Sequence, residues 1–290
     1  MDSRPDLPDS APTSNICVLG GTNIAGALTR QTEIGGSFTI ETQFGKSPEI
    51  FWGETQEVSF YHIPMHGGTG ADRTKPDYQE NAYLRTWSAF HRLGVTEVLG
   101  GATAGSINPE YKVGDWTVPD DFIDFNVDRP QSIAFQVLGE AGGHIWPRLN
   151  PATDPDIDGI LADGCRRHAP EVDTYHGGVI AQGPGSRFES AAEVRMMQTL
   201  GCDSVTASIP TEMIYARQVG IHYGCIVGIV NPAEGLGEWD WDTLSDCYPT
   251  FHRHSVAIYL DAIPRVARLL GKERAVDALR VHPEFDPDED

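Results

Sequence analysis

Short apolar runs alternate with segments of helical periodicity along most of this chain. Residues 16–19 are four apolar side chains that lead directly into a glycine pair. An apolar run that ends in glycines predicts a buried strand followed by a tight turn. Between residues 78 and 93, the aromatic residues Tyr83, Trp87 and Phe90 recur at helical spacing. Positions three and four apart share one helix face, so this segment is predicted to be an amphipathic helix.

The remaining pattern predicts a strand-rich first half and an alternation of helices and strands after residue 155. The further predicted strands are 37–43, 50–52, 57–63, 96–100 (ending in the small-residue run 100–106), a strand pair within 114–125, 174–181, 203–208 and 221–230. The further predicted helices are 157–168, 190–200, 210–219 and about 244–270. Such alternation is typical of an α/β fold. We therefore expect a single domain with a central mixed, largely parallel twisted sheet flanked by helices.

The two ends of the chain and one internal segment lack this periodicity. Residues 1–14 are polar and rich in Pro, Ser and Asp, without the apolar stretch of a signal peptide, which predicts a disordered lead. Residues 15–274 are expected to form the domain, and residues 275–290 an acidic C-terminal tail. The segment 126–155 is rich in Pro and Gly and predicts a long loop. Loops of that length are usually functional or interfacial.

Composition narrows the classes of function. A chain of 290 residues can bury a sizeable core. Its 42 acidic residues against 21 Lys and Arg give a net charge of -21, which argues against nucleic acids and anionic membranes as partners. An anionic substrate would therefore need a local positive pocket. No apolar segment has membrane-spanning length, and the five scattered cysteines fit the reduced thiols of a cytoplasmic protein.

Polar side chains follow several of the predicted strands. In open α/β sheets, ligands gather at the carboxyl ends of the strands. The residues expected there are Thr22, His66, Ala102, Thr103, Ser208 and Asn231, with Phe188 and Glu189 at the head of a helix. Taken singly, such residues have ordinary structural roles, because hydroxyls cap helices, carboxylates suit helix N-termini and Asn is common in turns.

One histidine pair has a spacing that metal sites use. His62 and His66 are four residues apart, which places two ligands on one face of a helix. Pro64 lies between them in a strand-like context and argues against a helix there. We therefore expect no metal site.

A series of short motifs runs from about residue 16 to 270. They are Gly20-Gly21-Thr22, His66-Gly67, Tyr78-Gln79-Glu80-Asn81, Ala104-Gly105-Ser106-Ile107 with Pro109 and Gly114-Asp115, Val118-Pro119-Asp120-Asp121-Phe122-Ile123-Asp124, Arg129-Pro130-Gln131-Ser132, Gly183-Pro184, Phe188-Glu189-Ser190-Ala191-Ala192-Glu193 and Glu212. In this order and spacing, the sequence resembles the trimeric purine nucleoside phosphorylase and methylthioadenosine phosphorylase family.

The resemblance implies cleavage of the N-glycosidic bond of a purine nucleoside by phosphate, giving free base and a pentose 1-phosphate. Phosphate is then the co-substrate, with no cofactor or metal, and the protein is a homotrimer or a dimer of trimers. The implied roles are Asn231 and His66 in catalysis; Thr22, His66, Thr103 and Ser208 at phosphate; Glu189, Phe188 and Asn231 at the base; and Ala207, with His144 from the neighbouring subunit, at the sugar.

The implied base-binding residues Asn231 and Glu189 indicate which nucleosides the protein would cleave. Members of this family that cleave adenine nucleosides carry Asp where this chain has Asn231, and those acting on 6-oxopurines carry Asn. An amide can donate to a purine O6 and accept from a protonated N7, whereas a carboxylate only accepts. Glu189 would accept from N1–H or from a 2-amino group. The resemblance therefore implies a 6-oxopurine preference.

Three positions depart from the family pattern. Met65 replaces an arginine that binds phosphate, Ala102 replaces a hydroxyl residue, and Ala207 replaces a methionine under the ribose. Losing an arginine–phosphate contact costs roughly 1.5–3 kcal/mol. Thr103 can substitute for the hydroxyl, and the cations available in the adjoining loop are Arg73 and Lys75. Two alternatives stay open: a nucleoside hydrolase that uses water, and a non-catalytic purine-binding homologue.

Overall fold

Four parallel strands form the centre of the protein. In spatial order they are β13 (His222–Pro232), β7 (Glu97–Ser106), β1 (Ile16–Leu19) and β6 (Val58–Ile63). They are the buried apolar runs of the sequence. The computed structural model describes residues 5, 7–24, 26–64, 78–126, 129–184 and 187–280.

Antiparallel pairs extend this parallel centre on both sides, so the predicted mixed sheet is confirmed. On the β6 side, β5 (Ile50–Thr55) and then β2 (Ile34–Phe38) add antiparallel neighbours. On the other side lie β8 (Trp116–Val118), β10 (Thr174–His176), β12 (Ser204–Thr206), β11 (Val179–Gln182) and β9 (Asp121–Asp124). Strands β3 (Glu41–Thr42) and β4 (Gly45–Lys46) form a separate hairpin.

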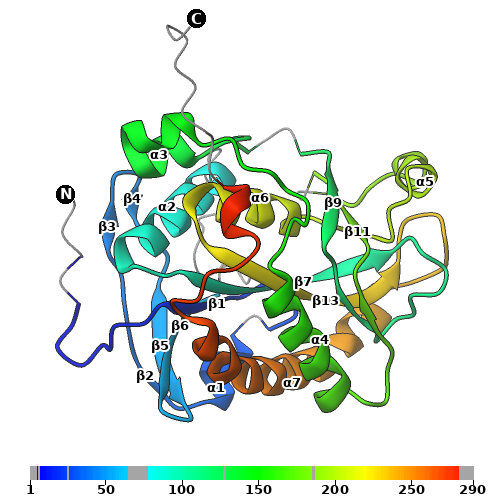
Figure 1. The fold of residues 1–290 in the computed structure, drawn as a ribbon. Helices are drawn as coiled ribbons and strands as arrows, with labels where there is room; N and C mark the ends of the chain where they lie inside the picture. The colour runs from blue at the N-terminus through cyan, green and yellow to red at the C-terminus, as the bar shows by residue number, and fades with distance from the viewer. Residues whose placement is uncertain are drawn as a thin grey trace, which may run out of the picture.

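Helices cover both faces of the sheet (Figure 1). One face carries α2 (Tyr78–Leu93), α3 (Ala134–Leu138) and α6 (Ile209–Val219), and the other carries α1 (Ala27–Gln31), α4 (Pro155–His168) and α7 (Trp241–Val266). Alternate residues of β1 join the two cores, which ties the layers into one domain. Helix α5 (Ala191–Thr199) packs beside β11 and β12 in a third cluster. Three short 3₁₀ helices complete the fold: η1 (Gly139–His144), η2 (Ala267–Leu269) and η3 (Asp277–Leu279).

The small-residue run 100–106 corrects one expectation. It was predicted to follow a strand that ends at Gly100, but β7 continues through it to Ser106, so Ala102 and Thr103 lie within the strand. The small residues serve close packing instead of a turn. A Cβ on Gly101 would come within 2.1 Å of the Tyr259 hydroxyl.

Three other predicted segments differ in detail. The predicted strand 174–181 is two strands, because Gly177 and Gly178 have φ values of 90° and 114° and break the extended backbone. The predicted loop 126–155 contains α3 and η1. The short helix α1 was not predicted at all. The long helix predicted from 244 begins earlier, at Trp241, where the Asp240 side chain accepts a hydrogen bond from the backbone N–H of Thr243.

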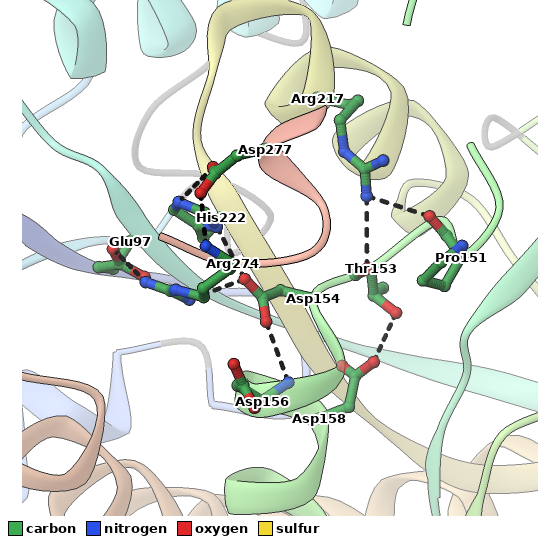
Figure 2. A network of polar contacts seen from close by, with 10 residues as sticks. All are labelled: Glu97, Pro151, Thr153, Asp154, Asp156, Asp158, Arg217, His222, Arg274 and Asp277. Atoms are coloured by element: carbon green, nitrogen blue, oxygen red, sulfur yellow. Dashed lines mark hydrogen bonds and ion pairs between the residues drawn. The ribbon is translucent and has the colours of Figure 1, made fainter. Parts of the chain in front are cut away.

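A buried ionic network closes the amino ends of the central strands (Figure 2). Arg274 donates to Glu97, the first residue of β7, at 2.6 Å and to Asp154 at 2.7 Å. His222, the first residue of β13, lies 2.7 Å from Asp154 and 3.2 Å from Asp277. The network thus fastens the segment around η3 to the sheet, at the end opposite to the expected ligand site. Where the domain ends stays a prediction.

No helix in the described part of the chain is both long enough and apolar enough to span a membrane.

Candidate active site

The loop after β1 lies directly against β7. A Cβ on Gly21 would come within 1.9 Å of the Gly101 carbonyl oxygen, so only glycine permits this approach. The contact brings the Thr22 and Thr103 hydroxyls to 2.7 Å from each other, where they share a hydrogen bond. A hydroxyl from the loop after β1 and a hydroxyl from β7 therefore converge at one point, which is a suitable arrangement for binding the oxygens of an anion.

Helix α7 supports this pair from one side. The His252 ring donates from Nε2 to the Thr22 carbonyl at 3.1 Å. Burial raises the pKa of Tyr248, while its side-chain hydrogen bond with Thr103 opposes the shift. The Tyr248 and His252 rings stack with their centroids 6.0 Å apart. The two threonines are thus supported by a helix that is distant from both of them along the chain.

A cavity of about 460 Å³ opens beside Thr103, at the carboxyl ends of the central strands. This volume is in the range of small-molecule sites. The sequence-predicted residues that line it are Thr103, Phe188, Glu189, Ala207 and Asn231. The structure therefore brings the three expected base residues to one cavity, together with one expected sugar residue, Ala207, and one expected phosphate residue, Thr103.

Asn231 and Glu189 bring the polar groups that can read a base. Asn231 is buried near the end of β13, and its Nδ2 donates to the Pro232 carbonyl at 2.7 Å. Its Oδ1 and second N–H make no hydrogen bond with the residues that the structure describes, so both remain available to a ligand. Burial raises the pKa of Glu189, and Glu193 and Glu234 add to the shift. A partly buried carboxylate of this kind is suited to accept hydrogen bonds from a neutral ligand.

Ser208 and Ala207 join β12 to α6. Ser208 is the N-cap residue of α6, but its side chain makes no capping hydrogen bond, so capping does not account for its hydroxyl. It follows Ala207, which lines the cavity, but Ser208 is not among the residues of the cavity wall. Behind this turn, Gln182 and Thr211 exchange hydrogen bonds at 2.7 and 2.9 Å and fix the start of α6.

Several expected residues are not placed by the structure. His66, Met65, Arg73 and Lys75 lie outside the described residues. His144 belongs to η1, and only its backbone is described. The assignments of His66 and His144 therefore stay predictions.

Sequence reasoning missed the contribution of α7 and of the segment before it. Leu244, Tyr248 and Trp241 line the cavity, together with Arg187, Thr206 and Glu234. Trp241 also packs against Phe188, with ring centroids 5.7 Å apart. Helical periodicity predicted a helix here, but it carried no sign of which turn reaches the ligand. The aromatic residues next to Asp240 are the sequence feature that could have indicated that the start of α7 lines a cavity.

The fold is that of an α/β protein with a cavity at the carboxyl ends of its central parallel strands. The chain matches the Phosphorylase superfamily over residues 15–263 and belongs to that family. It is 32% identical to a probable 6-oxopurine nucleoside phosphorylase of Moorella thermoacetica, over 76% of this chain and 80% of that protein. It is 28% identical to the 6-oxopurine nucleoside phosphorylase of Pyrococcus furiosus, over 89% of this chain and 94% of that protein.

Solved structures show the same fold. A methylthioadenosine phosphorylase from an antarctic soil metagenomic library superposes with a TM-score of 0.77 at 20% identity, over 95% of this chain and 94% of that one. The methylthioadenosine phosphorylase from Schistosoma mansoni, in complex with tubercidin, gives a TM-score of 0.75 at 18% identity, over 92% of this chain and 98% of that one. The predicted family and fold class are confirmed.

Proposed function

We propose that this protein is a pentosyltransferase that cleaves the N-glycosidic bond of purine nucleosides, preferably 6-oxopurine nucleosides, with phosphate. The observation that carries the proposal is the placement of the Thr22–Thr103 hydroxyl pair at the edge of the cavity that Glu189 and Asn231 line. One end of the site thus suits an oxyanion, and the other presents hydrogen-bonding groups for a base. The relatives named 6-oxopurine nucleoside phosphorylase support the base preference.

In the proposed reaction, a phosphate oxygen forms a bond to the anomeric carbon while the bond to N9 of the base breaks. The electron pair of that bond leaves with the base, and a proton taken up from the solvent at N7 neutralises it. The Asn231 Oδ1 accepts a hydrogen bond from that N7–H, and an amide N–H donates to O6. No electrons pass to or from a carrier in this exchange, so phosphate is the only co-substrate that we propose.

The Thr103 hydroxyl supports phosphorolysis over hydrolysis. Ala102 stands where the family has a hydroxyl residue, and its side chain is buried in β7. The neighbouring Thr103 supplies the hydroxyl instead, at hydrogen-bonding distance from Thr22. We therefore propose that Thr103, one residue after Ala102, takes the place of the family's phosphate-binding hydroxyl residue.

The substrate assignment is tested by incubating the purified protein with inosine, guanosine and methylthioadenosine, each with and without phosphate. We expect base release from inosine and guanosine only with phosphate, and slower release from methylthioadenosine. The site would reject the adenine nucleoside because the Asn231 and Glu189 groups would be left unpaired. Equal rates for all three nucleosides would contradict the base preference. Base release at the same rate with and without phosphate would identify a hydrolase.

We also propose that the protein assembles as a trimer in the cytoplasm. Phe135 and Trp146 flank η1 and, with 60% and 72% of their surface exposed, are among the most exposed large apolar side chains that the structure describes. A subunit that covers them would bring the η1 segment, with His144, next to a neighbouring site. The described cysteines are unpaired, as expected for a reducing compartment.

A further inference from the structure

An arginine on α1 lies beside the Thr22 loop without a carboxylate partner. Arg30 is exposed and forms no ion pair with any residue that the structure describes. Arg187, by contrast, is paired with Glu193, and Arg274 with Glu97. Arg30 shares the lack of a described carboxylate partner with other exposed arginines such as Arg253, so its position beside the Thr22 loop is what distinguishes it.

The Arg30 side chain turns back along its own helix toward the loop. A Cβ on Gly26 would come within 2.7 Å of Arg30 Nη1, so the guanidinium lies over the backbone just before α1 begins. Gly26 is four residues after Thr22. The absence of a side chain at Gly26 therefore leaves room for the guanidinium next to the anion loop.

Arg30 and His252 both lie near the Thr22 loop. The pKa of His252 is lowered first by burial and further by the positive charge of Arg30, while the hydrogen bond to the Thr22 carbonyl opposes the shift. The lowered pKa favours the neutral His252 ring, so Arg30 carries the positive charge beside this loop. A bound oxyanion would be attracted to that charge.

We propose that Arg30 is a phosphate-binding residue, which supplies the positive charge that Met65 does not. This proposal rests on the proposed function, since it assigns the cation for the same co-substrate. The guanidinium presents several N–H donors in a fixed plane, which suits phosphate oxygens. His252 acts as a positioning residue, because its hydrogen bond holds the Thr22 carbonyl.

The main test is the KM for phosphate of an Arg30→Gln variant at saturating inosine. Losing a charge-assisted contact lowers anion affinity roughly tenfold to a hundredfold, so the KM for phosphate should rise by that factor. The KM for inosine should change less than twofold. Arg253→Gln is the matched control, since it removes the same charge from an exposed residue next to His252. An equal KM for phosphate in both variants would overturn the proposal.

A double-mutant cycle separates geometry from charge. Gly26 has φ -90° and ψ 14°, which an alanine can adopt, so Gly26→Ala should fold and only displace the guanidinium. It should raise the KM for phosphate in the parent protein and have no further effect in the Arg30→Gln background. Additive effects of the two substitutions would contradict the assignment.

Phosphate binding without turnover distinguishes this proposal from the proposed function. Phosphate should raise the melting temperature of the parent protein above a chloride control of equal ionic strength, and Arg30→Gln should need about tenfold more phosphate for the same rise. If the parent shows this rise and the variant loses it, but no pentose 1-phosphate forms, the anion site stands and the function fails. If phosphate dependence is intact in Arg30→Gln, the function stands and the Arg30 proposal fails.

Discussion

At the residue scale, Asn231 is the position that we propose decides which base the site accepts. Its buried amide lies in the wall of the cavity with one N–H donated to the Pro232 carbonyl. A 6-oxopurine presents an acceptor at C6, and only an amide can donate to it while still accepting from N7–H.

We expect Asn231→Asp to lower kcat/KM for inosine about a hundredfold, because a carboxylate cannot donate to O6 and the two acceptors repel. The loss for methylthioadenosine should be smaller, since a 6-amino group donates to the carboxylate. Steady-state kinetics with both nucleosides measure this change of preference. An equal loss for both would indicate a general defect and would contradict the assigned role.

Thr103 is a second residue with a separable role. Thr103→Val keeps the shape of the side chain and removes the hydroxyl that contacts Thr22. Losing one hydrogen bond costs about 1.5 kcal/mol, so we expect the KM for phosphate to rise roughly tenfold. The KM for inosine, measured on the same samples, is the internal control. A rise confined to inosine would place Thr103 at the nucleoside instead.

The titration of His252, which contacts the Thr22 loop, is expected to change the stability of the protein at acidic pH. Burial lowers its pKa below the usual value of about 6.5, so the unfolded chain takes up a proton at a higher pH than the folded protein does. The contribution of neutral His252 is therefore present above pH 6.5 and is lost as the pH falls through the folded pKa.

The matching variant is His252→Gln, whose amide can still donate to the Thr22 carbonyl but does not titrate in this range. The free energy of unfolding, measured with urea at pH 7.5 and 5.5, should fall less in this variant than in the parent. A parent and variant with the same loss between the two pH values would contradict the role given to His252.

At the element scale, the amino and carboxyl ends of the central strands have different tasks. The carboxyl ends form the ligand cavity, while the amino ends of β7 and β13 carry the buried network of Arg274, Glu97 and Asp154 (Figure 2). Removing one member of a buried ion pair leaves the others without compensation.

We therefore expect Arg274→Met to lower the free energy of unfolding by about 3–5 kcal/mol, since both carboxylates stay buried without their partner. Urea denaturation measures the change. Arg268→Met is the control, because Arg268 is exposed in η2 and its loss should change stability by about 0.5 kcal/mol or less. Equal losses of unfolding free energy in the two variants would contradict this expectation, because the buried network would then stabilise the protein no more than an exposed arginine does.

The sequence predicted the elements better than their roles. Periodicity placed α2 correctly, because its aromatic face is buried in one core, and the apolar run placed β1. The small-residue run was misjudged, because glycines that permit close packing and glycines that permit turns look alike in a sequence. The contact of His252 with Thr22 could not be predicted, since it joins residues 230 apart and depends on how α7 packs.

The candidate site was predicted where residue types and strand ends coincide. Thr103, Glu189 and Asn231 reach one cavity because parallel strands bring their carboxyl ends to one edge. Tyr248 was missed for a different reason. It lies on a helix and reaches the cavity only through its side-chain direction, which periodicity does not report.

At the scale of the whole molecule, the exposed aromatic residues around η1 predict an assembly. A Phe135→Glu and Trp146→Glu double variant should shift the protein from trimer to monomer, because a carboxylate at a buried interface loses its hydration. Light scattering coupled to size-exclusion chromatography measures the mass. A parent protein that is already monomeric would contradict the proposed trimer.

The central claim is that phosphate, and not water, accepts the pentose. The most direct test follows base release from inosine as phosphate is raised from zero to saturation, with the sugar product identified by ³¹P NMR. The account predicts no release without phosphate, a saturable rise with it, and one ribose 1-phosphate for each base released. Base release without phosphate, with free ribose as the product, would contradict it.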